Sequence, residues 1–260
     1  MKIAVSGKGG VGKTLVAGVL AVSFAKKGFK VLAIDADPSP NLALTLGISP
    51  DEAKMIVPIS ENTQLVESKT KTSYSGVYRL SFKVDDIVKD FSVKSPYGVN
   101  LLVMGTVRSA GTGCLCPANA VVRALLQHLY VERSEVVVMD MEAGIEHLGR
   151  GTAKHVDAMI AVTDSSFKAM ETAKRTHELA TEMGIKKFFL IGNKIADTSE
   201  GKLIQQFAKN NNISLLGLIP YDKQIMEADM RGESPIKYSN KSKGIEVIQQ
   251  QGESLIKLAT

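Results

Sequence analysis

The stretch Ser-Gly-Lys-Gly-Gly-Val-Gly-Lys-Thr, residues 6–14, is the part of the sequence on which the interpretation of the whole chain depends. It follows an apolar run at residues 3–5 and precedes a segment, 15–27, whose pattern predicts a helix. In that setting, the spacing Gly-x-x-x-x-Gly-Lys-Thr indicates a loop that binds the phosphates of a nucleoside triphosphate.

The residue types in this loop suit phosphate binding. Glycine allows backbone conformations that a Cβ would forbid, so consecutive N–H groups can converge on phosphate oxygens. The ammonium of Lys13 can reach the β- and γ-phosphates, and the hydroxyl of Thr14 can ligate Mg²⁺. The N-terminus of the following helix adds its positive dipole end to the same site. The loop residues expected to bind nucleotide are Gly9, Gly10, Val11, Gly12, Lys13 and Thr14.

The composition is typical of a globular protein with an aliphatic core. The 260 residues are 44% hydrophobic and 5% aromatic, which suits a single domain over 1–260. The formal charge is +5, but the basic residues are scattered, so we expect no nucleic acid partner. No apolar run is long enough to span a membrane, and the chain starts directly with a predicted strand. We therefore expect a cytoplasmic protein without a membrane partner.

The rest of the chain alternates between strand and helix patterns, which predicts an α/β fold with a mostly parallel sheet and helices on both faces. The segment from about 49 to 95 is the least regular. There we expect a short helix at 50–56 and then a loop with a hairpin, forming a functional insertion. Elsewhere strands are expected at 30–34, 99–104, 135–139, 157–163, 188–191 and 213–219, and helices at 118–129, 166–183 and 245–258.

Acidic residues stand where two of the predicted strands end. Asp35 and Asp37 follow one strand, and Asp140 follows another. Carboxylates at the carboxyl ends of parallel strands lie where open α/β sheets bind ligands. Such a carboxylate can orient an attacking water or hold Mg²⁺. The alternative for Asp35 and Asp37 is that they cap a helix that starts near Asn41.

Two cysteines, Cys114 and Cys116, stand just before Pro117 and the predicted helix at 118–129. A helix N-terminus lowers the pKa of a thiol and favours the thiolate, which is the form that binds metals. The pair supplies two ligands, whereas divalent metals bound by thiolates take four, so a second copy of the chain would complete a site. A buried inert pair and a redox dithiol are alternatives; the glycine-rich segment 105–113 counts against the inert pair.

Lys8 is a second lysine inside the phosphate loop, and Lys-Gly-Gly-Val-Gly-Lys-Thr resembles the deviant Walker A motif of the MinD, ParA and nitrogenase iron-protein ATPases. The resemblance implies a P-loop NTPase three-layer fold and an ATP-sandwiched homodimer, in which Lys8 reaches the partner subunit's nucleotide. The alternative is that Lys8 only adds positive charge to its own loop. In these ATPases the second aspartate of Asp-x-Asp-Pro positions the hydrolytic water, and Asp37 matches it. The resemblance thus implies Mg-dependent ATP hydrolysis with Lys8, Lys13 and Asp37 as catalytic residues.

Two further motifs of these ATPases are matched later in the chain. Asp140-Met-Glu-Ala-Gly144 resembles Walker B running into switch II, which implies that Asp140 anchors the Mg²⁺ shell and Gly144 senses the γ-phosphate. The magnesium residues implied are Thr14, Asp37 and Asp140. For His147, which follows, a place in a capped loop is the simpler interpretation.

The same resemblance implies base contacts after two late strands. Asn193 matches the adenine-contacting asparagine of this ATPase group, and the Pro-x-Asp turn that follows the last strand packs on the adenine edge in these proteins. The alternative is that these are ordinary turn residues. The residues concerned are Asn193, Lys194, Pro220, Tyr221 and Asp222.

Four motifs together narrow the resemblance. They are the phosphate loop, Gly-Cys-Leu-Cys-Pro-Ala-Asn at 113–119, Asp-Met-Glu-Ala-Gly-Ile-Glu-His-Leu-Gly-Arg-Gly-Thr at 140–152, and Gly-Asn-Lys at 192–194. The combination resembles the CooC-type nickel-insertion ATPases that mature carbon monoxide dehydrogenase, and their relatives that serve acetyl-CoA synthase. The resemblance implies that Cys114 and Cys116 of two protomers bind one Ni²⁺ or Zn²⁺ at the dimer interface, with one of those nickel enzymes as the client.

Two functions of other classes stay open. One is a positioning ATPase of the MinD or ParA kind; the terminal helix at 245–258 carries Glu246 and Glu253 and lacks a Lys/Arg-rich polar face, which disfavours membrane docking. The other is an iron–sulfur carrier or reductase. Nitrogenase-type reductases use two widely separated cysteines per chain, whereas this chain has an adjacent pair.

Overall fold

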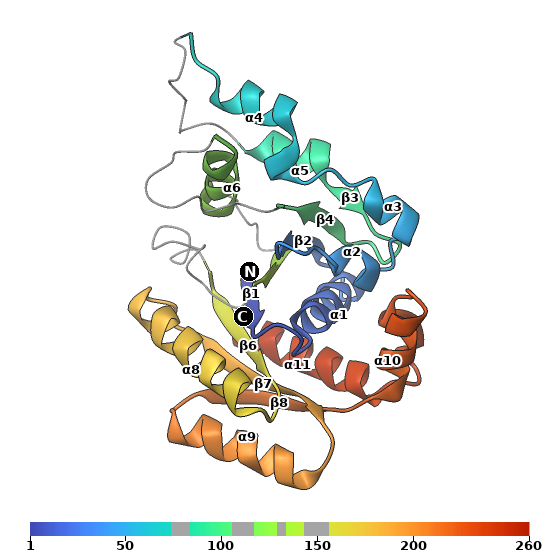
Figure 1. The fold of residues 1–260 in the computed structure, drawn as a ribbon, viewed down its shortest axis with the longest axis vertical. Helices are drawn as coiled ribbons and strands as arrows, with labels where there is room; N and C mark the ends of the chain where they lie inside the picture. The colour runs from blue at the N-terminus through green and yellow to red at the C-terminus, as the bar shows by residue number, and fades with distance from the viewer. Residues whose placement is uncertain (74–83, 106–116, 129–133, 143–155, 260) are drawn as a thin grey trace.

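The computed structural model describes residues 1–73, 84–105, 117–128, 134–142 and 156–259, and within this part the strands form one eight-stranded sheet (Figure 1). The strand order is β3-β4-β2-β5-β1-β6-β7-β8; β3 is antiparallel to β4, and the other pairings are parallel. The predicted α/β fold with a mostly parallel sheet is therefore confirmed. The strands are β1 (Lys2–Gly7), β2 (Lys30–Ala36), β3 (Val93–Lys94), β4 (Asn100–Val103), β5 (Glu135–Met141), β6 (Ala158–Thr163), β7 (Phe188–Ile195) and β8 (Ser214–Pro220).

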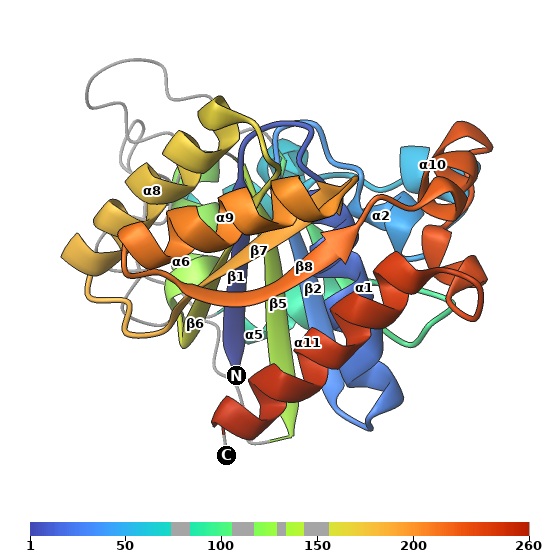
Figure 2. The same ribbon diagram turned by 90° about the horizontal axis from the view of Figure 1, so that it is seen from below.

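Helices cover both faces of the sheet. One face carries α1 (Lys13–Lys26), α2 (Leu42–Thr45) and α11 (Lys243–Ala259), and the other carries α6 (Pro117–His128), α8 (Phe167–Glu182) and α9 (Thr198–Asn210). Figure 2 shows α1 and α11 on the side of the sheet opposite α8 and α9. The remaining helical elements are α3 (Pro50–Lys54), η1 (Ile59–Glu61), α4 (Thr63–Thr70), α5 (Asp85–Phe91), α10 (Lys223–Met230) and η3 (Pro235–Tyr238).

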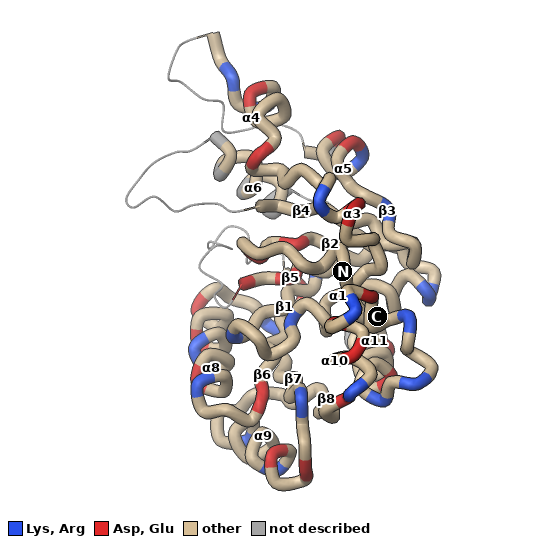
Figure 3. Tube along the Cα trace, turned by 45° about the vertical axis from the view of Figure 1, so that its right-hand side comes forward, with Lys and Arg blue, Asp and Glu red and all other residues tan. Residues whose placement is uncertain are grey.

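The central strands are apolar on both faces because each face is covered. In β1, Ile3 and Val5 belong to the cluster that packs with α1 and α11, whereas Ala4 belongs to the cluster on the other face. All six residues of β6 are buried. Continuous apolar runs, rather than alternating ones, are what a parallel sheet with two covered faces requires. Most charged residues lie on the outer helices and loops, where both signs are interspersed (Figure 3), and buried exceptions include Asp35 of β2 and Asp140 of β5.

The segment from 49 to 95 differs from its prediction. The expected short helix is α3, which begins with a capping box formed by Ser49 and Glu52. The expected loop is wrong for its first part, since η1 and α4 follow, with the Asn62 side chain accepting a hydrogen bond from the Leu65 N–H. The predicted hairpin falls mainly on 74–83, outside the described residues. Few apolar residues mark α4, so its polar composition concealed the helix.

Figure 1 shows α4, α5 and α6 grouped at the β3–β4 end of the sheet. Ile59 of η1, Leu65 of α4 and Ile87 of α5 are buried in the same cluster as Val121 and Leu125 of α6. The irregular segment therefore supports α6, the helix that follows the cysteine pair in the sequence.

Candidate functional site

The phosphate loop leaves β1 and enters α1 at the carboxyl edge of the sheet. Two residues from the end of β7 hold it: Asn193 Nδ2 donates to the Val11 carbonyl at 2.7 Å, and Lys194 Nζ donates to the Gly10 carbonyl at 2.8 Å. Gly12 has a positive φ of 94°, and a Cβ there would collide with Asn193 Nδ2. The glycine is therefore required by both its backbone conformation and the close approach of Asn193.

The two lysines of the loop have different surroundings. Lys13 is 7% exposed, and its ammonium lies 3.8 Å from Asp37 Oδ2. This contact brings together two of the predicted catalytic residues. Lys8 is half-buried, and its side chain makes no ion pair with any residue that the structure describes.

Asp35 and Asp140 are neighbours in register at the ends of β2 and β5, and both are fully buried. Burial raises the pKa of Asp35 to about 6, although N–H groups of Leu42 and Asp37 donate to its carboxylate at 2.9 and 3.2 Å and oppose the rise. The alternative that Asp35 anchors the start of a helix near Asn41 thus agrees with its contact to Leu42, the first residue of α2.

Asp140 has no such partners. Neither of its carboxylate oxygens has a hydrogen bond within the described part of the chain. Burial raises the pKa of Asp140 to about 7. The nearby Thr14 hydroxyl favours the charged carboxylate and so acts against this rise. A buried carboxylate without hydrogen bonds is rare in proteins, because nothing offsets the free-energy cost of removing its charge from water.

A hard divalent cation would resolve this deficit. Mg²⁺ binds through one or two protein oxygen ligands together with phosphate oxygens and water. The Thr14 hydroxyl and the Asp140 carboxylate provide such oxygens beside the phosphate loop, so these residues fit the ion. No group of three or more His, Cys, Asp or Glu side chains able to hold a metal occurs among the described residues. Phosphate oxygens of a bound nucleotide and water would supply the other ligands of the ion.

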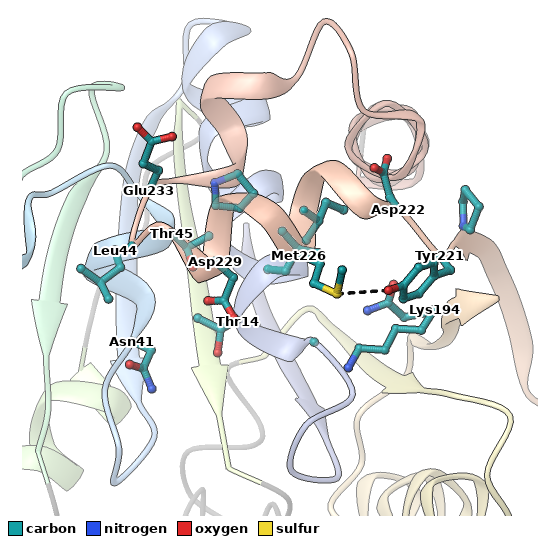
Figure 4. Close-up of a pocket in the computed structure, with 17 residues that line it drawn as sticks. Thr14, Asn41, Leu44, Thr45, Lys194, Tyr221, Asp222, Met226, Asp229 and Glu233 are labelled. Carbon is teal, nitrogen blue, oxygen red and sulfur yellow. Dashed lines mark hydrogen bonds between the residues drawn. The ribbon is translucent and has the colours of Figure 1, made fainter. Parts of the chain in front are cut away.

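A cavity of about 520 Å³ opens beside the phosphate loop (Figure 4). All the residues predicted to contact the base line it, together with residues of α2, α10 and η3 that the sequence did not single out. The lining includes Gly12, Thr14, Leu15, Asn41, Leu44, Thr45, Asn193, Lys194, Pro220, Tyr221, Asp222, Ile225, Met226, Asp229, Gly232, Glu233 and Pro235.

The polar side chains around this cavity differ in the hydrogen bonds that they make within the protein. Asp222 Oδ1 accepts the Gln224 N–H, while Oδ2 accepts the Ser242 hydroxyl at 2.7 Å and the Gly244 N–H at 3.0 Å. Burial would raise the pKa of Asp222, but these hydrogen bonds outweigh it and lower the pKa. Asp222 therefore joins the starts of α10 and α11. Both oxygens of its carboxylate accept hydrogen bonds from other residues of the chain. The Tyr221 hydroxyl donates to Met226 Sδ across the cavity mouth (Figure 4).

The α10 residues on the cavity wall were missed by sequence reasoning, although a signal was available. Asp222 is an N-cap residue, and an amphipathic run follows it up to Met230. The α9 helix was missed in the same way, after its N-cap Asp197.

Several predicted residues lie outside the described part of the chain: Cys114, Cys116, Gly144 and His147. The described residues stop at Gly105, well before Cys114, and resume at Pro117. Pro117 is the first residue of α6, so the predicted helix after the pair is present.

A family model for the CobQ/CobB/MinD/ParA nucleotide-binding domain matches residues 2–236. The chain belongs to this family of P-loop ATPases. It is 44% identical to the carbon monoxide dehydrogenase accessory protein CooC of Rhodospirillum rubrum over 236 residues, which cover 90% of this chain and 89% of that protein. It is 41% identical to an ATP-binding protein of Methanocaldococcus jannaschii over 245 residues, 93% of each chain.

The fold likeness extends to distant members. The septum site-determining protein MinD of Pyrococcus horikoshii, solved with Mg-ADP, superposes with a TM-score of 0.71 at 20% identity, covering 99% of this chain and 96% of that one. At this identity the match concerns the fold alone, and it confirms the P-loop NTPase architecture. None of the helices in the described residues has the length and apolar character needed to cross a membrane.

Proposed function

We propose that this protein is a Mg-dependent ATPase that binds Ni²⁺ or Zn²⁺ between two subunits and assists nickel insertion into carbon monoxide dehydrogenase or acetyl-CoA synthase. The observation that carries the proposal is the 44% identity to CooC across nine-tenths of the chain, combined with Cys-x-Cys directly before α6. The phosphate loop, Asp37 and the unpaired Asp140 carboxylate support ATP hydrolysis at the same edge of the sheet.

The residues around the loop divide the chemistry between them. Lys13 neutralises charge on the transferred phosphoryl group, and Asp37, held 3.8 Å from the Lys13 ammonium, orients the attacking water. Asp140 and Thr14 would hold Mg²⁺, and the bound ion would supply positive charge that offsets the charge of the phosphates. The base enters the cavity between Asn193 and the Pro220–Asp222 turn. Lys8 reaches the partner subunit's phosphates when two subunits close on ATP.

The cargo metal requires two chains. Cys114 and Cys116 offer two thiolates, and a second pair from the partner subunit completes the four soft ligands that Ni²⁺ or Zn²⁺ takes from such a site. ATP closes the dimer and brings the pairs together; hydrolysis relaxes the dimer and lowers its metal affinity. This coupling needs ATP to favour the closed state over the open one, because a ligand shifts an equilibrium only by its differential affinity.

Size-exclusion chromatography with light scattering and metal analysis tests the proposal. The wild-type chain and a Cys114→Ser/Cys116→Ser variant are compared with MgADP and with a slowly hydrolysed MgATP analogue. We expect one Ni²⁺ or Zn²⁺ per wild-type dimer and none in the variant, which still dimerises with ATP. If the wild type forms dimers with nucleotide but holds no metal, the ATPase assignment would stand and the nickel-delivery proposal would be rejected. A monomer in every nucleotide state would reject the shared metal site.

A further inference from the structure

The short helix α2 is held at its carboxyl end by a residue far away in the sequence. The Ser234 hydroxyl donates to the Thr45 carbonyl at 2.6 Å, although the two residues are 189 positions apart. Thr45 is the last residue of α2, and Ser234 is 8% exposed, so this bond is largely shielded from water. The last carbonyls of a helix have no partner within it, and here a distant side chain supplies one.

The start of α2 is held by Asp35 at the end of β2. The Leu42 N–H donates to Asp35 Oδ2 at 2.9 Å, and the Asp37 N–H donates to Asp35 Oδ1 at 3.2 Å. A Cβ at Gly18 of α1 would lie 2.5 Å from Thr45 Cγ2, so α2 packs closely on α1. Because a four-residue helix has little stability of its own, these tertiary contacts decide where α2 lies.

Between the two anchors lies the segment 37–41, which carries the predicted water-positioning residue. Within the segment the hydrogen bonds are local: Asp37 Oδ1 accepts the Ser39 N–H at 2.9 Å, and Asn41 Nδ2 donates to the Ser39 carbonyl at 2.8 Å. The other carboxylate oxygen of Asp37 faces the Lys13 ammonium at 3.8 Å. Since the segment is short, the positions of its two ends limit where the Asp37 carboxylate can lie.

Ser234 belongs to a part of the chain that crosses over the cavity. We name residues 222–238, which comprise α10 and η3, the arm. One end of the arm is fixed to the start of α11 through the Asp222 carboxylate, and the other end is fixed to α2 through Ser234. Figure 4 shows α10 between Tyr221 on one side and α2 on the other, with Thr14 of the phosphate loop nearby.

The arm is braced internally where it meets α2. The Glu233 carboxylate accepts hydrogen bonds from the Tyr238 hydroxyl and the Lys237 ammonium. The Ser234 hydroxyl also accepts the Ile236 N–H at 3.3 Å, and Ile236 is buried. Ser234 therefore stands on a firmly held turn, so that its hydroxyl can keep α2 in one place.

We propose that Ser234 is a positioning residue for ATP hydrolysis, which acts through α2 on the segment 37–41 and hence on Asp37. The inference rests on the proposed function, because it takes Asp37 as the residue that orients the attacking water. Without the Ser234 hydroxyl, the Thr45 carbonyl loses its partner and α2 gains freedom at that end. The phosphate loop would still bind the nucleotide, whereas the attacking water would be held in line less often.

Steady-state kinetics of Ser234→Ala separate positioning from binding. We expect kcat to fall about tenfold, while KM for MgATP and the affinity for MgADP stay within about twofold of the wild type. Ser234→Thr keeps the hydroxyl and should restore kcat. A kcat for Ser234→Ala equal to that of the wild type would overturn the inference, and so would a kcat for Ser234→Thr as low as that of Ser234→Ala.

Ser242 offers a matched variant, because it makes the same two kinds of hydrogen bond at the other end of the arm. It is 2% exposed, donates to Asp222 Oδ2 at 2.7 Å and accepts the Ile245 N–H at 3.2 Å. Ser242→Ala should raise KM for MgATP, since it loosens the turn beside the base, and should change kcat little. An equal fall in kcat in Ser242→Ala and Ser234→Ala would overturn the assignment to α2.

Hydrogen exchange tests the hold on α2 without any activity measurement. The amides of 45–48 donate to the carbonyls of 41–44, so they report on α2. In the nucleotide-free protein, Ser234→Ala should speed their exchange and leave that of α9, on the other face of the sheet, unchanged. Unchanged exchange at 45–48 would overturn the inference even if kcat fell.

The remaining outcomes keep the inference distinct from the proposed function. If Ser234→Ala does not fold, Ser234→Cys takes its place, because a thiol is close in size and only a weak donor. The same falls in kcat and in protection are then expected. A wild type that hydrolyses no ATP would reject the proposed function, whereas normal exchange at 45–48 in a folded variant would reject the hold on α2.

Discussion

The phosphate loop and residues 57–70, which comprise η1 and α4 and which we name the platform, are held in place by different means. The loop is fixed by partners far away in the sequence: Asn193, which bonds to Val11, is 182 residues from it. The platform is held mainly by neighbours, with Asn62 capping α4 and Lys69 of α4 paired to Asp86 of α5. In the described part of the chain, the Ser60 N–H joins the platform to the sheet by donating to the carbonyl of Met104, the residue after β4.

This difference has a functional consequence. A phosphate site needs its donors preorganised before the nucleotide arrives, and long-range contacts from the sheet supply that order. The platform is cohesive through short-range contacts of its own, so a substitution there should leave the core of the sheet intact. Variants in each region should therefore affect different measurements.

The largest expected effect comes from Lys13→Gln. The loss of the buried ammonium removes the charge that faces the phosphates, and we expect ATP hydrolysis to fall roughly 100-fold or more. Lys26→Gln, at the exposed end of the same helix, is the control and should hydrolyse ATP normally. A Lys13→Gln rate close to that of the wild type would remove this lysine from the catalytic residues.

The next effect concerns the long-range anchor. Asn193→Ala leaves the Val11 carbonyl without its partner, and we expect a stability loss of about 1–3 kcal/mol with weaker nucleotide binding. Thermal unfolding and titration with MgADP measure the two quantities. Asn210→Ala, at the exposed end of α9, should change neither. Unchanged nucleotide affinity in Asn193→Ala would mean that the loop holds its shape without this anchor.

The Asp140 carboxylate predicts a pH dependence. Because burial raises its folded pKa to about 7 from 3.8, its contribution to stability is fully present below pH 3.8 and is lost as pH rises through about 7. In the nucleotide-free protein at pH 8, Asp140→Asn should therefore raise the melting temperature, while it abolishes the further stabilisation by MgATP. The exposed Asp90→Asn is the control. A lower melting temperature for Asp140→Asn at pH 8 would contradict the assignment.

The smallest effect on stability is expected from the ion pair that joins α4 of the platform to α5. Lys69 Nζ lies 2.6 Å from Asp86 Oδ2, and the Asp86 side chain is 55% exposed. Asp86→Asn should lower stability by less than about 1 kcal/mol, as surface ion pairs do. ATP hydrolysis should be unchanged. A large loss of hydrolysis would show that α5 contributes to the nucleotide site directly.

The sequence predicted the elements that have a strong apolar pattern and a motif at one end. The phosphate loop between β1 and α1, and Asp35 and Asp140 at strand ends, follow from residue type and spacing. The proximity of Asn193 to Val11 does not follow from spacing, because only the sheet order brings β7 beside the loop. The role of Asp222 in joining two helices likewise depends on tertiary contacts to Ser242 and Gly244.

The platform could not be predicted for a physical reason. Its helical elements are short, and they bury few large apolar side chains, such as Ile59 in η1 and Leu65 in α4. Their stability comes from packing against α6 rather than from a local periodic pattern. The assignment of Cys114 and Cys116 as metal ligands stays a prediction, since both lie outside the described residues.

The most direct test of the central claim is the rate at which a chelator captures Ni²⁺ from the preloaded dimer. The account predicts slow capture with a non-hydrolysable MgATP analogue, and fast capture once ATP is hydrolysed, in step with phosphate release. Lys13→Gln should stay slow with ATP. Equal capture rates with the analogue, ATP and ADP would contradict nucleotide-controlled metal release.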